Sequence, residues 1–271
     1  MPHRTRRVVA LVVLLVLVGL AAVLVAQRAN RSDGTTPPPP PPSNSMSPTT
    51  PSLTAEPTYE PTDAYGSPEP GLAQGDAEAG GGGRTLGPSG LPLGYSRNPT
   101  GAANAATNYL TWMNSLRIAD KSAADAMAAA AASGAGTRTA LTDSFDALRS
   151  GMGDLTADEE QVNRGAYAVA SYSPQRATVY VWAPEVTTDR SGQTDHLWSI
   201  EAIPLVWASD DWKLDRALIA QSGGAAVDPT NPAGNPSAAE KHSILTRTPA
   251  DPGDITDGAD QTWFEYTNAA R

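Results

Sequence analysis

The 271-residue chain contains no cysteine, which excludes disulfides, thiolate metal ligands, thiol nucleophiles and lipid attachment through a cysteine. Histidine occurs only three times, so imidazole chemistry has few candidates. Basic residues are also scarce: 19 lysines and arginines face 29 acidic residues, which gives a formal net charge of −10. Because clustered basic side chains bind phosphate backbones, this balance argues against a nucleic acid as partner.

One long hydrophobic run is present, from Val8 to Ala26, and three arginines precede it within residues 1–7. Its length is close to the ~20 residues that a helix needs to cross a bilayer. The end of such a segment that carries arginines stays in the cytoplasm. We therefore expect a cytoplasmic leader (1–7), a transmembrane helix in the lipid bilayer of the cell membrane (8–26), and an extracytoplasmic remainder.

The same hydrophobic run has a second interpretation, a cleaved secretory signal. Signal peptides carry about 7–15 apolar residues and a cleavage site flanked by small residues. Cleavage after Ala26 would place Leu24 at the −3 position, where a small residue is preferred, and the polar Gln27 and Arg28 follow directly. These residues favour an uncleaved anchor, with a secreted protein as the alternative.

Residues 27–90 have no hydrophobic period and are rich in proline, glycine, serine and threonine. The six consecutive prolines Pro37–Pro42 favour a stiff polyproline helix, whereas Gly80–Gly83 favour flexible coil. No lysine–serine pair follows these glycines, so they do not form a phosphate loop. With few apolar groups to offset chain entropy, we expect a disordered linker over 27–90.

Helical periodicity begins in the region 91–220. Apolar residues predict a helix over 101–116 with Thr100 as its N-cap, an alanine-rich helix that ends near residue 132, and a third helix from Thr137. Thr156 is expected to cap a further short helix, because acidic residues follow it at 158–160.

Side chains that alternate between two faces along the chain then predict four strands, over 165–172, 176–186, 196–207 and 212–218. The short turns between them indicate antiparallel pairing. Helices followed by strands predict an α+β domain at 91–220, in which N-terminal helices pack on a curved antiparallel sheet of about four strands.

The last part of the chain, 221–271, is predicted to be a mostly irregular acidic tail, because prolines and glycines interrupt any period. An aromatic cluster near its end, within 262–267, contains Trp263, Phe264 and Tyr266. Exposed aromatic clusters are uncommon without a partner, so we favour docking of 262–267 on the sheet over an exposed end.

Candidate catalytic and metal-binding residues are few. Asp195 beside His196 resembles an imidazole with its orienting carboxylate, but no Gly-x-Ser-x-Gly nucleophile elbow is present. The aspartates between Asp251 and Asp260 recur every third residue, whereas calcium loops use alternate positions. No histidine pair has zinc-binding spacing. We therefore expect no enzyme activity, no catalytic residues, no metal and no cofactor.

Tryptophans are concentrated on the predicted strands, at Trp182, Trp198, Trp207 and Trp212. They could line a ligand pocket, but aromatic side chains also favour half-buried sheet surfaces for packing alone, which is the preferred interpretation. The ionisable residues of the predicted strand faces are chiefly Glu201, Asp215 and Arg216. A deep cavity that holds two of them with shifted pKa values would favour a ligand-binding or enzymatic domain.

Three segments carry a resemblance to a known group: 91–95 (LPLGY), 101–109 (GAANAATNY) and the strand 198–207 with the following 211–214 (DWKL). They look like actinobacterial membrane-anchored proteins. The order of anchor, linker, helices and sheet resembles bitopic assembly proteins of type IV secretion and conjugation. The resemblance covers 91–220 and implies a cystatin-like outer domain, of the kind shared with nuclear transport factor two, without catalytic residues.

These features together lead us to expect a non-catalytic, single-pass membrane protein. Its outer domain would contact other cell-envelope proteins as a scaffold, within a conjugation or secretion machine or within another complex such as one for lipid import. The alternative is a small-molecule-binding or enzymatic cystatin-like cone, either anchored or secreted. The sequence does not specify the oligomeric state.

Overall fold

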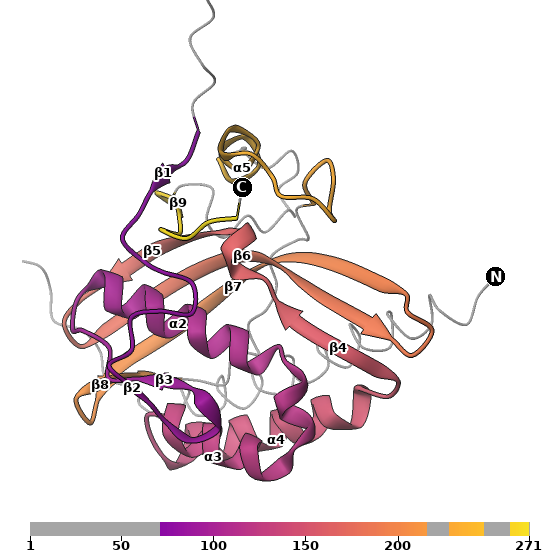
Figure 1. Cartoon of the computed structure of the whole chain (residues 1–271). Coiled ribbons are helices and arrows are strands. Elements are labelled where there is room, and N and C mark those ends of the chain that lie inside the picture. The colour runs from indigo at the N-terminus through magenta and orange to yellow at the C-terminus, as the bar shows by residue number, and fades with distance from the viewer. Residues whose placement is uncertain (1–70, 216–227, 247–260, 271) are drawn as a thin grey trace, which may run out of the picture.

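The computed structural model describes residues 71–215, 228–246 and 261–270, which Figure 1 draws in colour. Within these ranges no helix is both long enough and apolar enough to cross a membrane. The predicted membrane helix (8–26) lies outside the described residues. So do most of the predicted linker, Arg216 and the aspartates from Asp251 to Asp260.

Four α-helices occur in the described part of the chain: α2 (Pro99–Met113), α3 (Lys121–Ala131), α4 (Ala135–Gly151) and α5 (Ala238–Leu245). Short 3₁₀ helices are η1 (Pro88–Gly90), η2 (Leu116–Ala119) and η3 (Val162–Arg164).

The N-cap of α2 is Asn98 rather than the predicted Thr100. The Asn98 side-chain oxygen accepts a hydrogen bond from the Gly101 N–H at 2.7 Å. Pro99 then occupies the first helical turn, where its missing N–H needs no partner.

Among the described residues the main sheet has seven strands, in the order β1-β9-β5-β6-β7-β8 with β4 also paired to β6. Their bounds are β1 (Ala73–Gln74), β4 (Leu155–Glu160), β5 (Ala166–Tyr172), β6 (Arg176–Asp189), β7 (Thr194–Ala208), β8 (Asp211–Leu214) and β9 (Phe264–Glu265). A separate hairpin joins β2 (Thr85–Leu86) to β3 (Pro92–Leu93).

The predicted fold class therefore needs correction. The protein is α+β, but the sheet has seven strands instead of about four, and the pair β1–β9 is parallel, so the sheet is mixed. The prediction also included a membrane helix, and none of the described helices could span a membrane. The additional strands come from segments outside the predicted domain or from a segment predicted to be helical.

Residues 71–90, which the sequence assigned to the linker, contact the folded domain. Leu72 donates its N–H to the Ala238 carbonyl at 3.1 Å, and the Ala77 side chain is fully buried. The tail also has regular structure. It forms α5, and β9 lies between β1 and β5, so the aromatic cluster around Trp263 contacts the sheet.

The acidic segment 158–160 belongs to strand β4 and not to a short helix capped by Thr156. Asp158, Glu159 and Glu160 pair with Thr187, Val186 and Glu185 of β6. The Thr156 hydroxyl donates to the Thr188 carbonyl at 3.1 Å, so it contacts the neighbouring strand. Long-range pairing overrides the local helix signal here.

Two apolar layers lie on the two faces of the sheet. The inner face packs against α2, α3 and α4, and its core includes Val179, Val181 and Ile203. The outer face packs against α5, and its core includes Trp182 and Trp198. In Figure 1, α2 crosses the sheet, α3 and α4 lie together at one end of the domain, and β1, β9 and α5 lie at the other.

Candidate functional site

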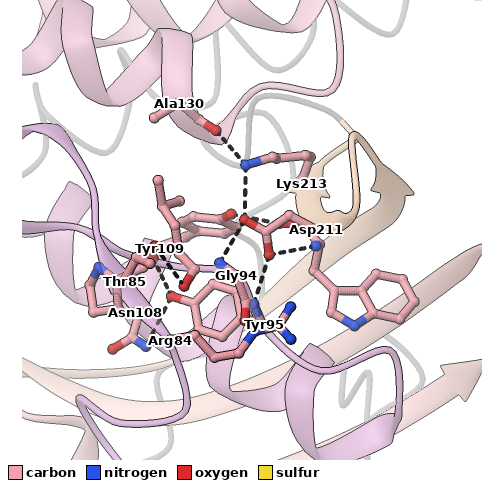
Figure 2. Close-up of polar contacts among 12 residues, drawn as sticks. Arg84, Thr85, Gly94, Tyr95, Asn108, Tyr109, Ala130, Asp211 and Lys213 are labelled. Carbon is pink, nitrogen blue, oxygen red and sulfur yellow. Dashed lines mark hydrogen bonds and ion pairs between the residues drawn. The ribbon is translucent and has the colours of Figure 1, made fainter.

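A polar network surrounds Asp211 at the start of β8 (Figure 2). The Asp211 carboxylate accepts hydrogen bonds from the Tyr95 N–H at 2.9 Å and the Gly94 N–H at 3.0 Å. The Lys213 ammonium lies 3.0 Å from the same carboxylate and donates to the Ala130 carbonyl at 2.8 Å. This aspartate therefore connects the segment before α2 to β8 and, through Lys213, to α3.

Two tyrosines extend this network into the core. The Tyr95 hydroxyl donates to the Pro92 carbonyl at 2.6 Å and lies 3.1 Å from the Asn108 amide nitrogen. The Tyr109 hydroxyl donates to the Trp212 carbonyl at 2.5 Å. Burial raises the pKa of both phenols, so both stay neutral. Residues of 91–95, 101–109 and 211–214 thus meet in one buried network.

The outer face holds a buried arginine. The Arg164 side chain lies over the Trp198 ring, 5.4 Å from its centroid, and donates to the Pro232 carbonyl at 2.9 Å. Trp198 donates its indole N–H to the same carbonyl at 3.0 Å and packs on Trp182, with ring centroids 4.3 Å apart. These tryptophans fill the outer core. At the opposite end of β7, Trp207 packs against Trp212, with centroids 5.4 Å apart.

The predicted Asp195–His196 pair does not form a catalytic arrangement among the described residues. The Asp195 carboxylate lies 3.2 Å from the Gln193 amide nitrogen, whereas the His196 Nδ1 lies 3.4 Å from the Arg164 guanidinium. Asp215 forms an ion pair with Arg176 at 2.6 Å. Glu201, the other described ionisable residue singled out on the strands, belongs to the cluster described next.

A carboxyl cluster lies on the inner face of the sheet, where β4, β6 and β7 run together. Glu160 is paired directly with Glu185, and Glu201 with Val181. Directly opposed residues of antiparallel strands point to the same face, and residues two apart on a strand do so too. Because Val181 belongs to the inner core, Glu185, Glu160 and Glu201 all point inward, as does Asp158.

The polar contacts of this cluster are mostly internal or local. Asp158 and Glu185 are diagonal neighbours across the pair β4–β6, and each raises or lowers the pKa of the other. The Asn114 amide, just after α2, donates to Glu160 at 2.7 Å, and the Ser199 hydroxyl donates to Glu201 at 3.2 Å. No ion pair joins any of the four carboxyl groups to a basic side chain within the described ranges.

This environment favours the neutral carboxylic acids. Burial raises the pKa of Glu160 to about 8, and the neighbouring Glu185, Glu201 and Asp158 add to the rise. Burial likewise raises the pKa of Glu185 and of Glu201 to about 7. Within the described segments no group of three or more acidic or histidine side chains is arranged to hold a metal ion. The chemistry that this cluster offers is the binding and release of protons near neutral pH.

Sequence reasoning identified Glu201 but not its partners. Glu160 was assigned to the start of a helix, and Glu185 was not singled out. Both lie at the inward-pointing positions of their strands, and Glu185 continues the alternation of Val179, Val181 and Ala183. Glu185 could have been identified from the sequence, because it is a charged residue at the end of an otherwise apolar strand face.

Comparison with known proteins yields one family. The chain matches the family model described as a domain of unknown function (DUF8175) over residues 27–231, which is more than half of the chain, and it belongs to this family. Searches of curated proteins and of solved structures gave no match.

Proposed function

We propose that the chain is a non-catalytic membrane protein that presents its folded domain outside the cell as an interaction module. Residues 8–26 hold it in the membrane, and the segment up to residue 70 supplies reach. The domain contacts other cell-envelope proteins, as a scaffold of a secretion-like, conjugation or other envelope complex. Tethering of this kind raises the effective concentration of a weakly binding domain near its partners.

One observation carries this proposal: the position where the chain joins the folded domain. Strand β1 begins at Ala73, at the start of the described residues, and pairs with β9 at the edge of the sheet. In Figure 1 this edge and α5 lie at one end of the domain, and α3 and α4 lie at the opposite end. A domain attached at one end presents its other end to partners. The family match, which begins at residue 27, also includes the region before the domain.

Site-specific photocrosslinking of the full chain in its own cells tests the proposal. A photoreactive residue is placed at Arg138 or Thr139, both exposed on α4, and in a matched control at Gln74, exposed on β1. We expect a discrete adduct with a membrane protein from the α4 positions and none from Gln74. Replacing residues 1–26 with a cleavable signal should abolish the adduct. An adduct that is absent, or that survives release from the membrane, would contradict the proposal.

A second candidate function is binding of a small cationic molecule by the domain. The observation that favours it is the group of inward-facing carboxyls, of which Glu185 and Glu201 are partly exposed. Nuclear magnetic resonance titration of the full chain with spermidine and with methylguanidinium distinguishes the two candidates. Saturable shifts of the Asn114 side-chain amide, lost in Glu201→Gln, would support binding, and unchanged spectra would eliminate it.

A further inference from the structure

The contact between Asp158 and Glu185 requires a proton. An ionised carboxylate has acceptors only, so two carboxyl groups can share a hydrogen bond only when one of them is protonated. The register of β4 on β6 makes these two side chains diagonal neighbours on the inner face, within reach of such a bond. The Asp158 Oδ1 atom is buried and has no hydrogen-bond partner among the described residues. Ionisation would leave this oxygen without solvation and would place two negative charges in contact.

The neighbours of this contact add negative charge when they ionise. Glu160 of β4 and Glu201 of β7 point to the same face, and the Tyr266 phenol also lies near Glu160. Helix α2 has no charged residue, and the group that follows it here is the neutral Asn114 amide. The adjoining η2 carries Arg117, whose side chain is exposed. Burial keeps the pKa of Glu160, Glu185 and Glu201 above the ordinary value of 4.5.

Apart from this contact, strand β4 makes few buried side-chain contacts. Of its six residues only Glu160 is buried, and its register with β6 shifts between Leu155 and Ala157. Segments with few buried apolar contacts open locally at low free energy. The position of β4 in the fold is therefore sensitive to the charge on its inward-facing carboxyl groups.

We propose that the Asp158–Glu185 contact, with Glu160 and Glu201 beside it, is a proton-dependent latch that holds β4 against β6. In the protonated cluster the carboxyl hydrogen bond closes the strand pair. When the cluster loses protons, repulsion and the exposure of Asp158 to water favour opening of β4. The direction is fixed by charge: mildly acidic conditions close β4, and mildly alkaline conditions open it.

Amide hydrogen exchange of the full chain in detergent tests the latch. Exchange rates are corrected for the intrinsic dependence on pH and compared at about pH 6 and about pH 8.5. From proton linkage at a group with a pKa near 7, we expect protection of β4 amides to fall by about tenfold or more over this interval. Amides at the centre of the β6–β7 pair exchange only when the whole domain opens, so their protection should stay above that of the β4 amides at both pH values.

Two variants make the test specific. Glu185→Gln keeps a neutral hydrogen-bonding side chain at every pH, so β4 protection should depend on pH clearly less than in the wild type, although Glu160 and Glu201 still ionise. Glu159→Gln is the matched control, because Glu159 lies on the same strand, is exposed and points to the opposite face. It should retain the wild-type response. Equal β4 protection at both pH values in the wild type, or an unchanged response in Glu185→Gln, would overturn the proposal.

A direct measurement covers the case in which a variant does not fold. Carbon-13 resonances of the side-chain carboxyls of the wild-type chain report each protonation step. We expect at least one carboxyl among Asp158, Glu160, Glu185 and Glu201 to titrate above about pH 6, where free carboxyls are fully ionised. Titration of every carboxyl below about pH 5 would overturn the latch. The readout needs neither a partner protein nor a membrane, so it is independent of the proposed scaffold function.

Discussion

The carboxylate of Asp211 accepts the backbone N–H of Tyr95 at 2.9 Å, although 116 positions separate the two residues in the chain. Asp211 is 5% exposed, and Tyr95 is fully buried. The bond fixes the segment that leads into α2 against the turn before β8.

Removal of this carboxylate should destabilise the whole domain. Asp211→Asn loses the charge that three backbone N–H groups and Lys213 share, and we expect the free energy of unfolding to fall by about 2–4 kcal/mol. Urea denaturation monitored by circular dichroism measures the change. Asp210→Asn is the matched control: Asp210 is exposed at the adjacent turn position, with a φ of 57° that asparagine tolerates. A similar loss in both variants would contradict the role of Asp211.

Lys241 and Glu265 form a buried ion pair at 2.7 Å, with the Lys241 side chain fully buried. Lys241→Met removes the cation and leaves a buried carboxylate, so we expect a loss of about 3–5 kcal/mol. The double variant Lys241→Met/Glu265→Gln removes both charges and should recover a large part of that loss. Urea denaturation of the two variants tests this, and equal stability of the single and double variants would contradict it.

The stability of the domain should decrease as the pH rises from about 5 to about 8.5. Glu160, Glu185 and Glu201 have folded-state pKa values of about 8, 7 and 7, above the ordinary 4.5 that the unfolded chain has. The folded state therefore binds more protons in this interval, and its advantage is lost as the cluster ionises. We expect a decrease on the order of 3 kcal/mol in the free energy of unfolding.

Denaturation curves at several pH values measure this dependence. Glu201→Gln should flatten it, since glutamine stays neutral, whereas Asp195→Asn changes an exposed carboxyl and should leave it unaltered. A wild-type stability that is constant or increases between about pH 5 and about pH 8.5 would contradict the raised pKa values.

Arg164 should stabilise the segment that precedes α5. Its guanidinium donates to the carbonyls of Pro232 and Gly234 and lies over Trp198. Lysine cannot reproduce this planar set of donors, so Arg164→Lys should cost about 2–3 kcal/mol and speed proteolysis within 228–237. Arg190→Lys is the control, because Arg190 is exposed and pairs with Asp154 only at 3.6 Å. Unchanged proteolysis in Arg164→Lys would disprove the role.

The long helices and strands were predictable because their apolar residues recur with a regular spacing. In β6 the alternation of Thr178, Tyr180 and Trp182 with Ala177 and Val179 matches the division between the two faces of the sheet. Strands β1 and β9 span two residues each, too few to show a period, and they form only because a distant segment supplies hydrogen bonds. Lys241 likewise gave no sign of burial, since a lysine on a short helix is normally exposed.

The carboxyl cluster was less predictable than the fold. Its members come from three strands, and Glu160 faces Glu185 only through the register of β4 on β6. That register depends on a strand whose sequence, Leu-Thr-Ala-Asp-Glu-Glu, has weak strand propensity and a strong local helix signal. Sequence alone could identify Glu201 as a charge on an apolar strand, but it could not bring the other carboxyl groups to it.

The parallel pair β1–β9 also constrains the order in which the domain can be built during synthesis. Strand β9 lies between β1 and β5, so β1 can join the sheet only after β9 has been added. A growing chain therefore completes its helices and central strands while Ala73 and Gln74 still lack their neighbouring strand. Ribosomal synthesis, and export where it occurs, must deliver residues up to Glu265 before the edge of the sheet closes.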